Sequence, residues 1–317
     1  PWLEDRPVTF ACTGFLAQGN DWEFTDGGIT VSVSDNTIST FYVQAIDRAY
    51  NDGGCSTAYA TYTEDSIDAS APVALTVTPA SPANMNDAGI RGTAEPQGWV
   101  RIHTNNQCDG GIVGQGTGAQ FAAASGIGVQ VNDNTATTYW ASQLDDAGNL
   151  SACSSTLDAS VTYREDSVFP PAPSGLTVSP ASPANNNTPK ISGTLSGINS
   201  YDIDASIVRI FTNSTCTTSV AQGTDYDFRV GGGIQVNQTD NTTVTYYAHV
   251  IDPAGNDGGC SATGVSFTED SIPPATATSV IVLPSARSNI NTPKVRGVIP
   301  LDAGDPGNTT IRVFSNS

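Results

Sequence analysis

Apolar and polar residues alternate along short stretches of this chain, and each stretch ends at Gly, Pro, Asn or Asp. In YYAHVID (246–252), Tyr246, Ala248 and Val250 fall on one face, together with Asp252, and the three intervening residues fall on the other. A period of two is typical of β-strands with one buried face. No window of the sequence places apolar residues at helical spacing. The pattern therefore predicts an all-β chain.

Four segments recur in the same order, which shows that the chain is built from copies of one unit. The spacing is 98 residues from Asp47 to Asp145 and 107 residues from Asp145 to Asp252. The recurring segments are a strand with an aromatic pair (34–47, 132–145, 239–252), a turn before a cysteine (48–55, 146–153, 253–260), an acidic exit (61–66, 162–167, 266–271) and a lead-in (75–87, 176–188, 280–292). About seven short strands per hundred residues, separated by turn signals, predict antiparallel β-sandwiches in tandem.

The copies divide the chain into four predicted segments. Residues 67–167 and 168–271 are whole units, residues 1–66 carry the later strands of a unit, and residues 272–317 carry the first strands of another. The string IRVFSNS (311–317) matches VRIFTNS (208–214) in a whole unit. Each partial unit alone would expose strand edges and an apolar face. We therefore expect the tail of one copy to complete the head of the next, as in donor-strand complementation.

A head-to-tail contact of this kind is heterologous, and a rotation that does not close produces an open filament. The sequence therefore predicts copies of this chain as its partners, with a host or neighbouring cell surface as a further one. Two other hypotheses stay open. The segment could belong to the stalk of a large tandem-repeat adhesin, or it could be a carbohydrate- or protein-binding module that uses the loops at the ends of its sandwiches.

The six cysteines occur as two per unit, separated by 43, 45 and 44 residues. The short paired spacings typical of zinc sites are absent. The regular spacing therefore predicts one disulfide per unit and a location outside the reducing cytosol. The predicted pairs are Cys12–Cys55, Cys108–Cys153 and Cys216–Cys260.

The chain is strongly acidic, with 31 Asp and Glu against 12 Lys and Arg and a net charge of −19. Such a chain repels nucleic-acid phosphates and anionic lipid. No apolar run approaches the roughly 18 residues of a membrane span. We therefore expect neither nucleic-acid binding nor membrane insertion.

The repeat also tests the two histidines as candidates for catalysis. His103 aligns with Phe211, and His249 aligns with Gln44 and Ser142. A position that changes in this way between sister units carries no shared chemistry. The chain also has no G-x-S-x-G nucleophile elbow with triad partners. We therefore expect a protein that is not an enzyme.

Two acidic motifs make calcium the one cofactor that the sequence admits. A D-x-A-x-N turn begins at an aspartate in each unit, and a Glu-Asp pair lies in each acidic exit. Calcium takes six to eight oxygen ligands, which carboxylates and turn carbonyls at a junction between units can supply. In the alternative interpretation, Asp and Asn simply cap tight turns through local backbone hydrogen bonds. The candidates are Asp47, Glu64, Asp65, Asp145, Glu165, Asp166, Asp252, Glu269 and Asp270.

Six N-x-S/T sequons mark candidate glycosylation sites on surface turns, provided that the host glycosylates exported proteins. They are Asn149, Asn186, Asn213, Asn237, Asn241 and Asn308. The large aromatics Trp22, Trp99 and Trp140 are expected to pack in sandwich cores.

The repeated motifs resemble those of a known family. The lead-in PASPANNNTP (180–189), the strand and turn TYYAHVIDPAGN (245–256) and the exit TEDS (268–271) resemble bacterial immunoglobulin-like repeats of secreted adhesins and surface-fibre proteins. The resemblance covers nearly the whole chain, and only residues 1–11 depart from it as an insertion. It implies immunoglobulin-like sandwiches and a bacterial, secreted protein located outside the cell or at its surface.

Overall fold

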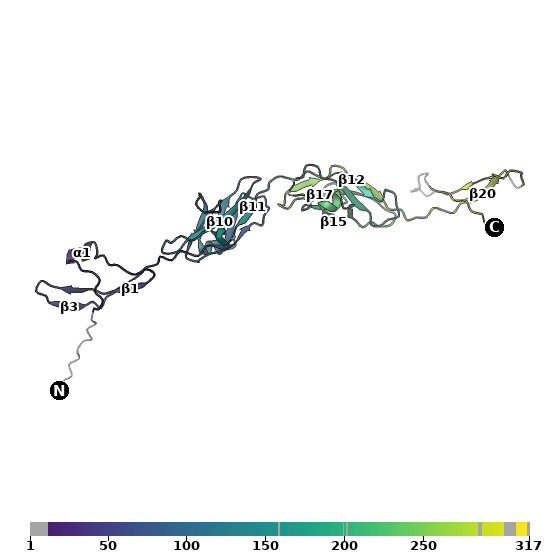
Figure 1. Cartoon of the computed structure of the whole chain (residues 1–317). Helices are drawn as coiled ribbons and strands as arrows, with labels where there is room; N and C mark the ends of the chain where they lie inside the picture. Colours follow the sequence, from purple (N-terminus) through teal and green to yellow (C-terminus); the bar gives the residue numbers. More distant parts are fainter. Residues whose placement is uncertain are drawn as a thin grey trace, which may run out of the picture. The chain divides into compact units, whose positions relative to one another are not determined.

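The computed structural model describes residues 12–157, 159–198, 200, 202–284, 287–300 and 309–315 (Figure 1). The chain forms two compact units, one of residues 1–81 and 85–164 and the other of residues 82–84 and 165–317. Each unit contains one complete β-sandwich and one smaller group of strands. The predicted boundaries of the four segments stay a prediction.

The sandwich of the first unit consists of two antiparallel sheets. One has the order β5 (Val73–Thr78), β6 (Asp87–Thr93), β9 (Ile127–Gln130). The other has the order β11 (Val161–Arg164), β10 (Ala136–Leu144), β7 (Trp99–His103), β8 (Ile112–Thr117). The short helix α2 (Gly118–Ala122) connects β8 to β9, and a 3-10 turn, Ser154–Leu157, precedes β11.

The sandwich of the second unit repeats this arrangement. One sheet has the order β12 (Ser174–Ser179), β13 (Lys190–Thr194), β16 (Ile234–Gln235). The other has the order β15 (Ser219–Thr224), β14 (Ile207–Phe211), β17 (Thr243–Ile251), β18 (Asp257–Cys260), and β19 (Val265–Thr268) also pairs with β17. The helix α3 (Asp225–Arg229) follows β15. The predicted fold class, all-β tandem immunoglobulin-like sandwiches of about seven strands, is confirmed.

The remaining strands form two-stranded sheets, and no second layer covers them within the described residues. We call the part of the first unit that precedes its sandwich the head. In the head, β1 (Ile38–Phe41) pairs with β4 (Ala60–Thr63) and β2 (Gln44–Ile46) pairs with β3 (Asp52–Cys55). In the second unit, the tail that follows the sandwich contains β20 (Thr278–Leu283) paired with β21 (Lys294–Val298). The repeat aligns β1 and β2 with β17, β3 with β18, β4 with β19, and β20 and β21 with β12 and β13.

The predicted alternation of burial along the strands is confirmed in β17. Tyr246, Ala248 and Val250 are buried, whereas the residues between them are only half-buried. Residues of the other sheet, including Ile191 and Ile234, complete the same core. The hydrophobic face is therefore shared between two sheets, which is the physical basis of a sandwich.

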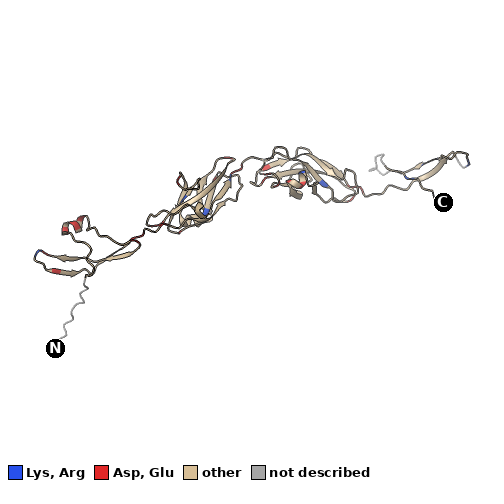
Figure 2. Ribbon diagram, viewed as in Figure 1, with Lys and Arg blue, Asp and Glu red and all other residues tan. Residues whose placement is uncertain are grey.

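Three short helices are the main feature that the apolar pattern did not predict. Each begins with a capping box, in which a polar N-cap and the third helical residue exchange hydrogen bonds. The pairs are Asn20 with Glu23 in α1 (Asp21–Asp26), Thr117 with Gln120 in α2, and Thr224 with Asp227 in α3. Acidic residues in the first turns of α1 and α3, drawn in red in Figure 2, interact favourably with the positive N-terminal ends of the helix dipoles. Helices of five or six residues are too short to show an apolar period.

The structure joins Cys12–Cys55, Cys108–Cys153 and Cys216–Cys260 as disulfides. The expectation for the tryptophans was wrong in two cases, because Trp22 and Trp99 are exposed and Trp140 is half-buried. The core positions of the helices are occupied instead by phenylalanines, Phe121 in α2 and Phe228 in α3.

Candidate functional site

The head exposes side chains that the complete sandwiches bury. Tyr62 in β4 is 54% exposed, whereas its equivalents Tyr163 in β11 and Phe267 in β19 are fully buried. Val43, beside β2, is likewise 42% exposed, and its equivalent Ala248 is fully buried. From residue 12 on, the described part of the head thus presents an apolar sheet face that no second layer covers.

The helix of the head shows the same difference. Phe24 in α1 is 50% exposed, whereas Phe121 and Phe228 at the same position of α2 and α3 are fully buried. These two rings lie against the second strand of the facing sheet. A Cβ added to Gly92 of β6 would lie 2.8 Å from the ring of Phe121, and one added to Gly193 of β13 would lie 2.7 Å from Phe228. Among the strands described in the head, none is the equivalent of β6 or β13, so Phe24 has no such strand beside it there.

The tail also exposes side chains whose equivalents are buried in the complete sandwich, and these belong to the strands that the head lacks. Val295 in β21 is 43% exposed, whereas the equivalent Ile191 is fully buried. Beyond it, Val313 and Phe314 are 65% and 81% exposed, although their equivalents lie in the buried strand β14. None of residues 309–315 belongs to a strand. In a complete sandwich, the strands equivalent to the tail pair with or pack against the strands equivalent to the head. The tail therefore contains elements of the sandwich that the head lacks.

The complete sandwich defines how these elements would pair. In the second unit β14 lies between β15 and β17, with Arg209 opposite His249 and Ile210 opposite Ala248. The same register would place Arg312 of a tail opposite Gln44 of a head, and Val313 opposite Val43. The head also keeps the strand pairing of the complete unit, because Gln44 faces Cys55 as His249 faces Cys260.

The acidic candidates for calcium separate into two groups. The glutamates act as backbone acceptors: Glu64 Oε2 accepts from the Asn36 N–H, and Glu269 Oε2 accepts from the Asn241 N–H, each at 2.6 Å. Both asparagines adopt positive φ angles. Glu165 is fully buried and accepts a hydrogen bond from Ser167. The glutamates therefore have a structural role in stabilising left-handed turns.

The aspartates that begin the D-x-A-x-N turns also cap those turns. The side-chain hydrogen bond from Asn51 lowers the pKa of Asp47, and that from Asn149 lowers the pKa of Asp145. Asp252 accepts from both the backbone N–H and the side-chain amide of Asn256, each at 2.8 Å. All three residues therefore have a local role in capping their turns. Only Asp252 among them is also buried, at 4% exposure.

The aspartates of the acidic exits use one oxygen in the same way. Oδ1 of Asp65 accepts from the Ile67 N–H, Oδ1 of Asp166 from the Val168 N–H, and Oδ1 of Asp270 from the Ile272 N–H. Their environments differ, because Asp65 is exposed, Asp270 is half-buried, and Asp166 is only 2% exposed.

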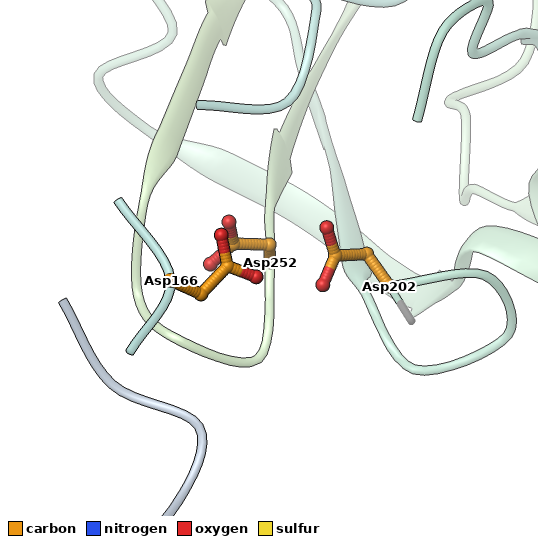
Figure 3. Close-up of side chains that lie close together, drawn as sticks. All are labelled: Asp166, Asp202 and Asp252. Carbon is orange, nitrogen blue, oxygen red and sulfur yellow. The ribbon is translucent and has the colours of Figure 1, made fainter. Parts of the chain in front are cut away.

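Two of the predicted candidates come together with a third residue in the second unit. Oxygens of Asp166, Asp202 and Asp252 all lie within 4.8 Å of one another, and all three residues are buried (Figure 3). Asp252 follows β17, Asp166 precedes β12, and Asp202 lies in the connection from β13 to β14. Asp202 is not among the candidates predicted from the sequence. The one feature of the sequence that could have pointed to it is the length of the connection in which it lies. Twelve residues separate Thr194 from Ile207, whereas five separate Thr93 from Trp99 in the sister unit.

The histidines form no recognisable catalytic arrangement within the described residues. His103 Nε2 lies 3.0 Å from Ser142 Oγ, but both residues are buried and His103 Nδ1 has no hydrogen-bond partner to orient the ring. Burial lowers the pKa of His103. His249 Nε2 is in hydrogen-bond contact with Oδ1 of the exposed Asp257.

The sequons occupy different environments. Asn237 and Asn241 are exposed, whereas Asn149, Asn186 and Asn213 are half-buried. The side-chain amide of Asn149 is engaged with the Asp65 carbonyl and with Asp145. Asn308 lies outside the described residues. Glycosylation stays a prediction.

Among the residues that the structure describes, no helix has both the length and the apolar character needed to cross a membrane.

No protein-family model matches the sequence, and no curated protein matches it either. Among solved structures, the FN1–FN3 domains of chicken CNTN1 are 10% identical with a TM-score of 0.36, and the match covers 73% of this chain and 77% of that one. Fibronectin(III)-like modules of Clostridium thermocellum CbhA are 10% identical with a TM-score of 0.37, covering 62% and 95%. Murine CEACAM1b is 11% identical with a TM-score of 0.32, covering 61% and 96%. At these scores the fold rests on the strand order and registers of the chain itself.

Proposed function

We propose that this chain is a non-catalytic structural subunit of an extracellular filament, in which the tail of one copy completes the sandwich begun by the head of the next. The observation that carries the proposal is the exposure, in head and tail, of the positions that both complete sandwiches bury. The three disulfides support a location outside the reducing cytosol. The family resemblance suggests that this location is a bacterial surface.

In the proposed joint, the elements of the head and those of the tail are different parts of one sandwich. The head supplies the equivalents of α3, β17, β18 and β19, and the tail supplies the equivalents of β12, β13 and β14. Burial of a large apolar side chain such as Tyr62 or Phe314 stabilises the buried state by roughly 1.5–3 kcal/mol. Several such side chains would be buried at each joint. An association of this size is strong enough to sustain a polymer, since each 1.4 kcal/mol or so changes an affinity tenfold.

The stalk of a longer adhesin is the second candidate. In that protein the missing strands would come from further segments of the same polypeptide, and an isolated 317-residue chain would not need to associate. The two hypotheses therefore differ in whether separate copies of this chain pair with each other.

A cysteine cross-link tests the proposed register. Arg312→Cys combined with Gln44→Cys places two thiols opposite each other if the tail pairs with the head as β14 pairs with β17. Directly opposed Cβ atoms of antiparallel strands lie about 4.5–5.5 Å apart, close enough for a disulfide after a small adjustment. Mild oxidation is expected to produce a ladder of linked chains on a non-reducing denaturing gel.

The matched control combines Arg312→Cys with Thr40→Cys, which lies four residues along the head and so about 13 Å out of register. This pair is expected to produce little ladder. A product of monomer size with an internal cross-link would show that the tail folds back onto its own head. The absence of any cross-link at micromolar concentration would favour the stalk and overturn the filament.

A further inference from the structure

We propose that the second sandwich binds one calcium ion between the carboxylates of Asp166, Asp202 and Asp252. This site is independent of the proposed assembly, because all three residues belong to one compact unit of a single chain. It selects two of the nine acidic candidates of the sequence and adds one that the sequence did not indicate.

The spacing of the carboxylates fits calcium. Their oxygens lie within 4.8 Å of one another. Calcium binds oxygens at about 2.3–2.6 Å, so two ligands on opposite sides of the ion are separated by roughly 4.6–5.2 Å. Magnesium binds at about 2.0–2.1 Å and requires a tighter octahedron. In Figure 3 the carboxylates of Asp166 and Asp252 lie side by side and that of Asp202 faces them.

The burial of the cluster points to a bound cation. Asp166, Asp202 and Asp252 are 2%, 1% and 4% exposed. Oδ2 of Asp166 is buried and accepts no hydrogen bond. Neither Asp166 nor Asp252 forms an ion pair with a basic residue of the described chain. Buried carboxylates are costly unless they are paired, protonated or bound to a metal. A divalent cation satisfies the orphaned oxygen of Asp166 and neutralises most of the charge.

The surrounding hydrogen bonds hold the ligands in place. The Asn256 side chain donates to Asp252 Oδ2 and, at 2.9 Å, to the carbonyl oxygen of Asp166, so a single amide links the two segments. The Val168 N–H holds Asp166 Oδ1, which leaves Oδ2 to face the cluster. These contacts fix ligand orientation before the ion binds, in the way that outer-shell groups do in metal sites.

The segment that carries Asp202 is also anchored. Its carbonyl oxygen accepts from the Ser206 N–H at 3.1 Å, and Arg229 of α3 bridges Asp204 and Asp225 at 3.0 Å each. Arg229 is therefore engaged within the connection. These contacts hold residues 202–206 beside the end of β17, where Asp202 lies close to Asp252.

The first sandwich provides an internal comparison. It contains the equivalents Asp65 and Asp145, but its shorter connection contains no aspartate, and its one acidic residue, Glu95, accepts a hydrogen bond from the Ser70 N–H. Asp65 is exposed and Asp145 is only half-buried. Because its carboxylates are more exposed to solvent than the three buried ones of the second sandwich, this location is expected to bind calcium at least tenfold more weakly.

The test uses the full chain after treatment with a chelator. Calorimetric titration with calcium is expected to show about one tight site, and calcium is expected to raise the unfolding temperature of the second sandwich. Asp202→Asn should weaken binding at least tenfold. In chelator, the same variant should be more stable than the native chain, because the substitution removes a repulsive charge. Asp145→Asn is the matched control and should leave the tight site unchanged.

Two results would overturn the site. One is an equal calcium response in the native chain and in Asp202→Asn. The other is an equal response to magnesium and calcium at the same concentration, which would indicate general screening of a chain with a net charge of −19. Asp166→Asn provides a second variant that should also lose the tight site, in case Asp202→Asn disturbs its own connection.

Discussion

Gly297→Val is expected to raise the concentration needed for filament assembly by about ten- to a hundredfold while leaving the single chain folded. In both complete sandwiches the helix phenylalanine occupies the space in which a Cβ at the equivalent glycine would lie. In the tail by itself, the nearest atom to a Cβ at Gly297 is the Thr278 carbonyl oxygen, at 3.2 Å. That contact with Thr278 is close, but the additional clash with an aromatic ring arises only when Phe24 of another copy packs against β21. Overpacking of this kind costs roughly 1–3 kcal/mol. Sedimentation across a concentration series measures the effect.

Two comparisons make this prediction specific. Gly111→Val is the control, because nothing lies within 4 Å of a Cβ at Gly111, and it should assemble normally. Phe24→Ala should weaken assembly by removing a buried ring. Adding Gly297→Val to Phe24→Ala should then cost less than Gly297→Val costs alone, as expected for residues in contact. Normal assembly of Gly297→Val would argue that Phe24 and Gly297 do not meet.

Replacing Cys216 and Cys260 by serine is expected to lower the free energy of unfolding of the second sandwich by roughly 4 kcal/mol, from the loop-closure entropy of a 44-residue separation. The disulfide joins the end of β18 to the turn after β14, two strands that flank β17. Since domains of this size are stabilised by only about 5–15 kcal/mol, the effect is a large fraction of the total. Differential scanning calorimetry of the full chain measures it.

The equivalent change at Cys108 and Cys153 is the matched control. It should destabilise the first sandwich and leave the transition of the second one in place, because in tandem repeats stability is largely local. Equal shifts of both transitions with either pair would contradict this expectation and would indicate that the chain unfolds as a single cooperative system.

The strand framework could be predicted well from the sequence. Tyr246, Ala248 and Val250 alternate with polar or half-buried neighbours, and a strand with one buried face requires that pattern. The repeat then extended the prediction from one strand to all copies. The short helices were missed for the opposite reason, because α1, α2 and α3 are only five or six residues long. Their capping boxes, such as Thr117 with Gln120, were the available signal.

The candidate metal centre could be predicted only in part. The turn aspartate Asp252 and the exit aspartate Asp166 stand out because they recur in register. Asp202 occurs once, in a connection whose length differs between the two complete units, so no periodicity marks it. The glutamates recur just as regularly as the aspartates, yet Glu64 and Glu269 serve as acceptors for backbone amides. A residue that recurs in every copy of a repeat is expected to have a role common to the copies, but the recurrence does not show whether that role is to cap a turn or to bind a metal.

The sequence alone was enough to predict the β class, the repeated unit, the regular cysteine spacing and the likeness of head and tail to parts of a whole sandwich, because each of these is a local or periodic property of the chain. The folded structure was needed to show which side chains stay exposed in the head and tail, and which three carboxylates meet in the second sandwich. Burial and convergence depend on contacts between residues such as Asp166 and Asp252, which are far apart in the chain. Those contacts exist only once the two sheets have packed together.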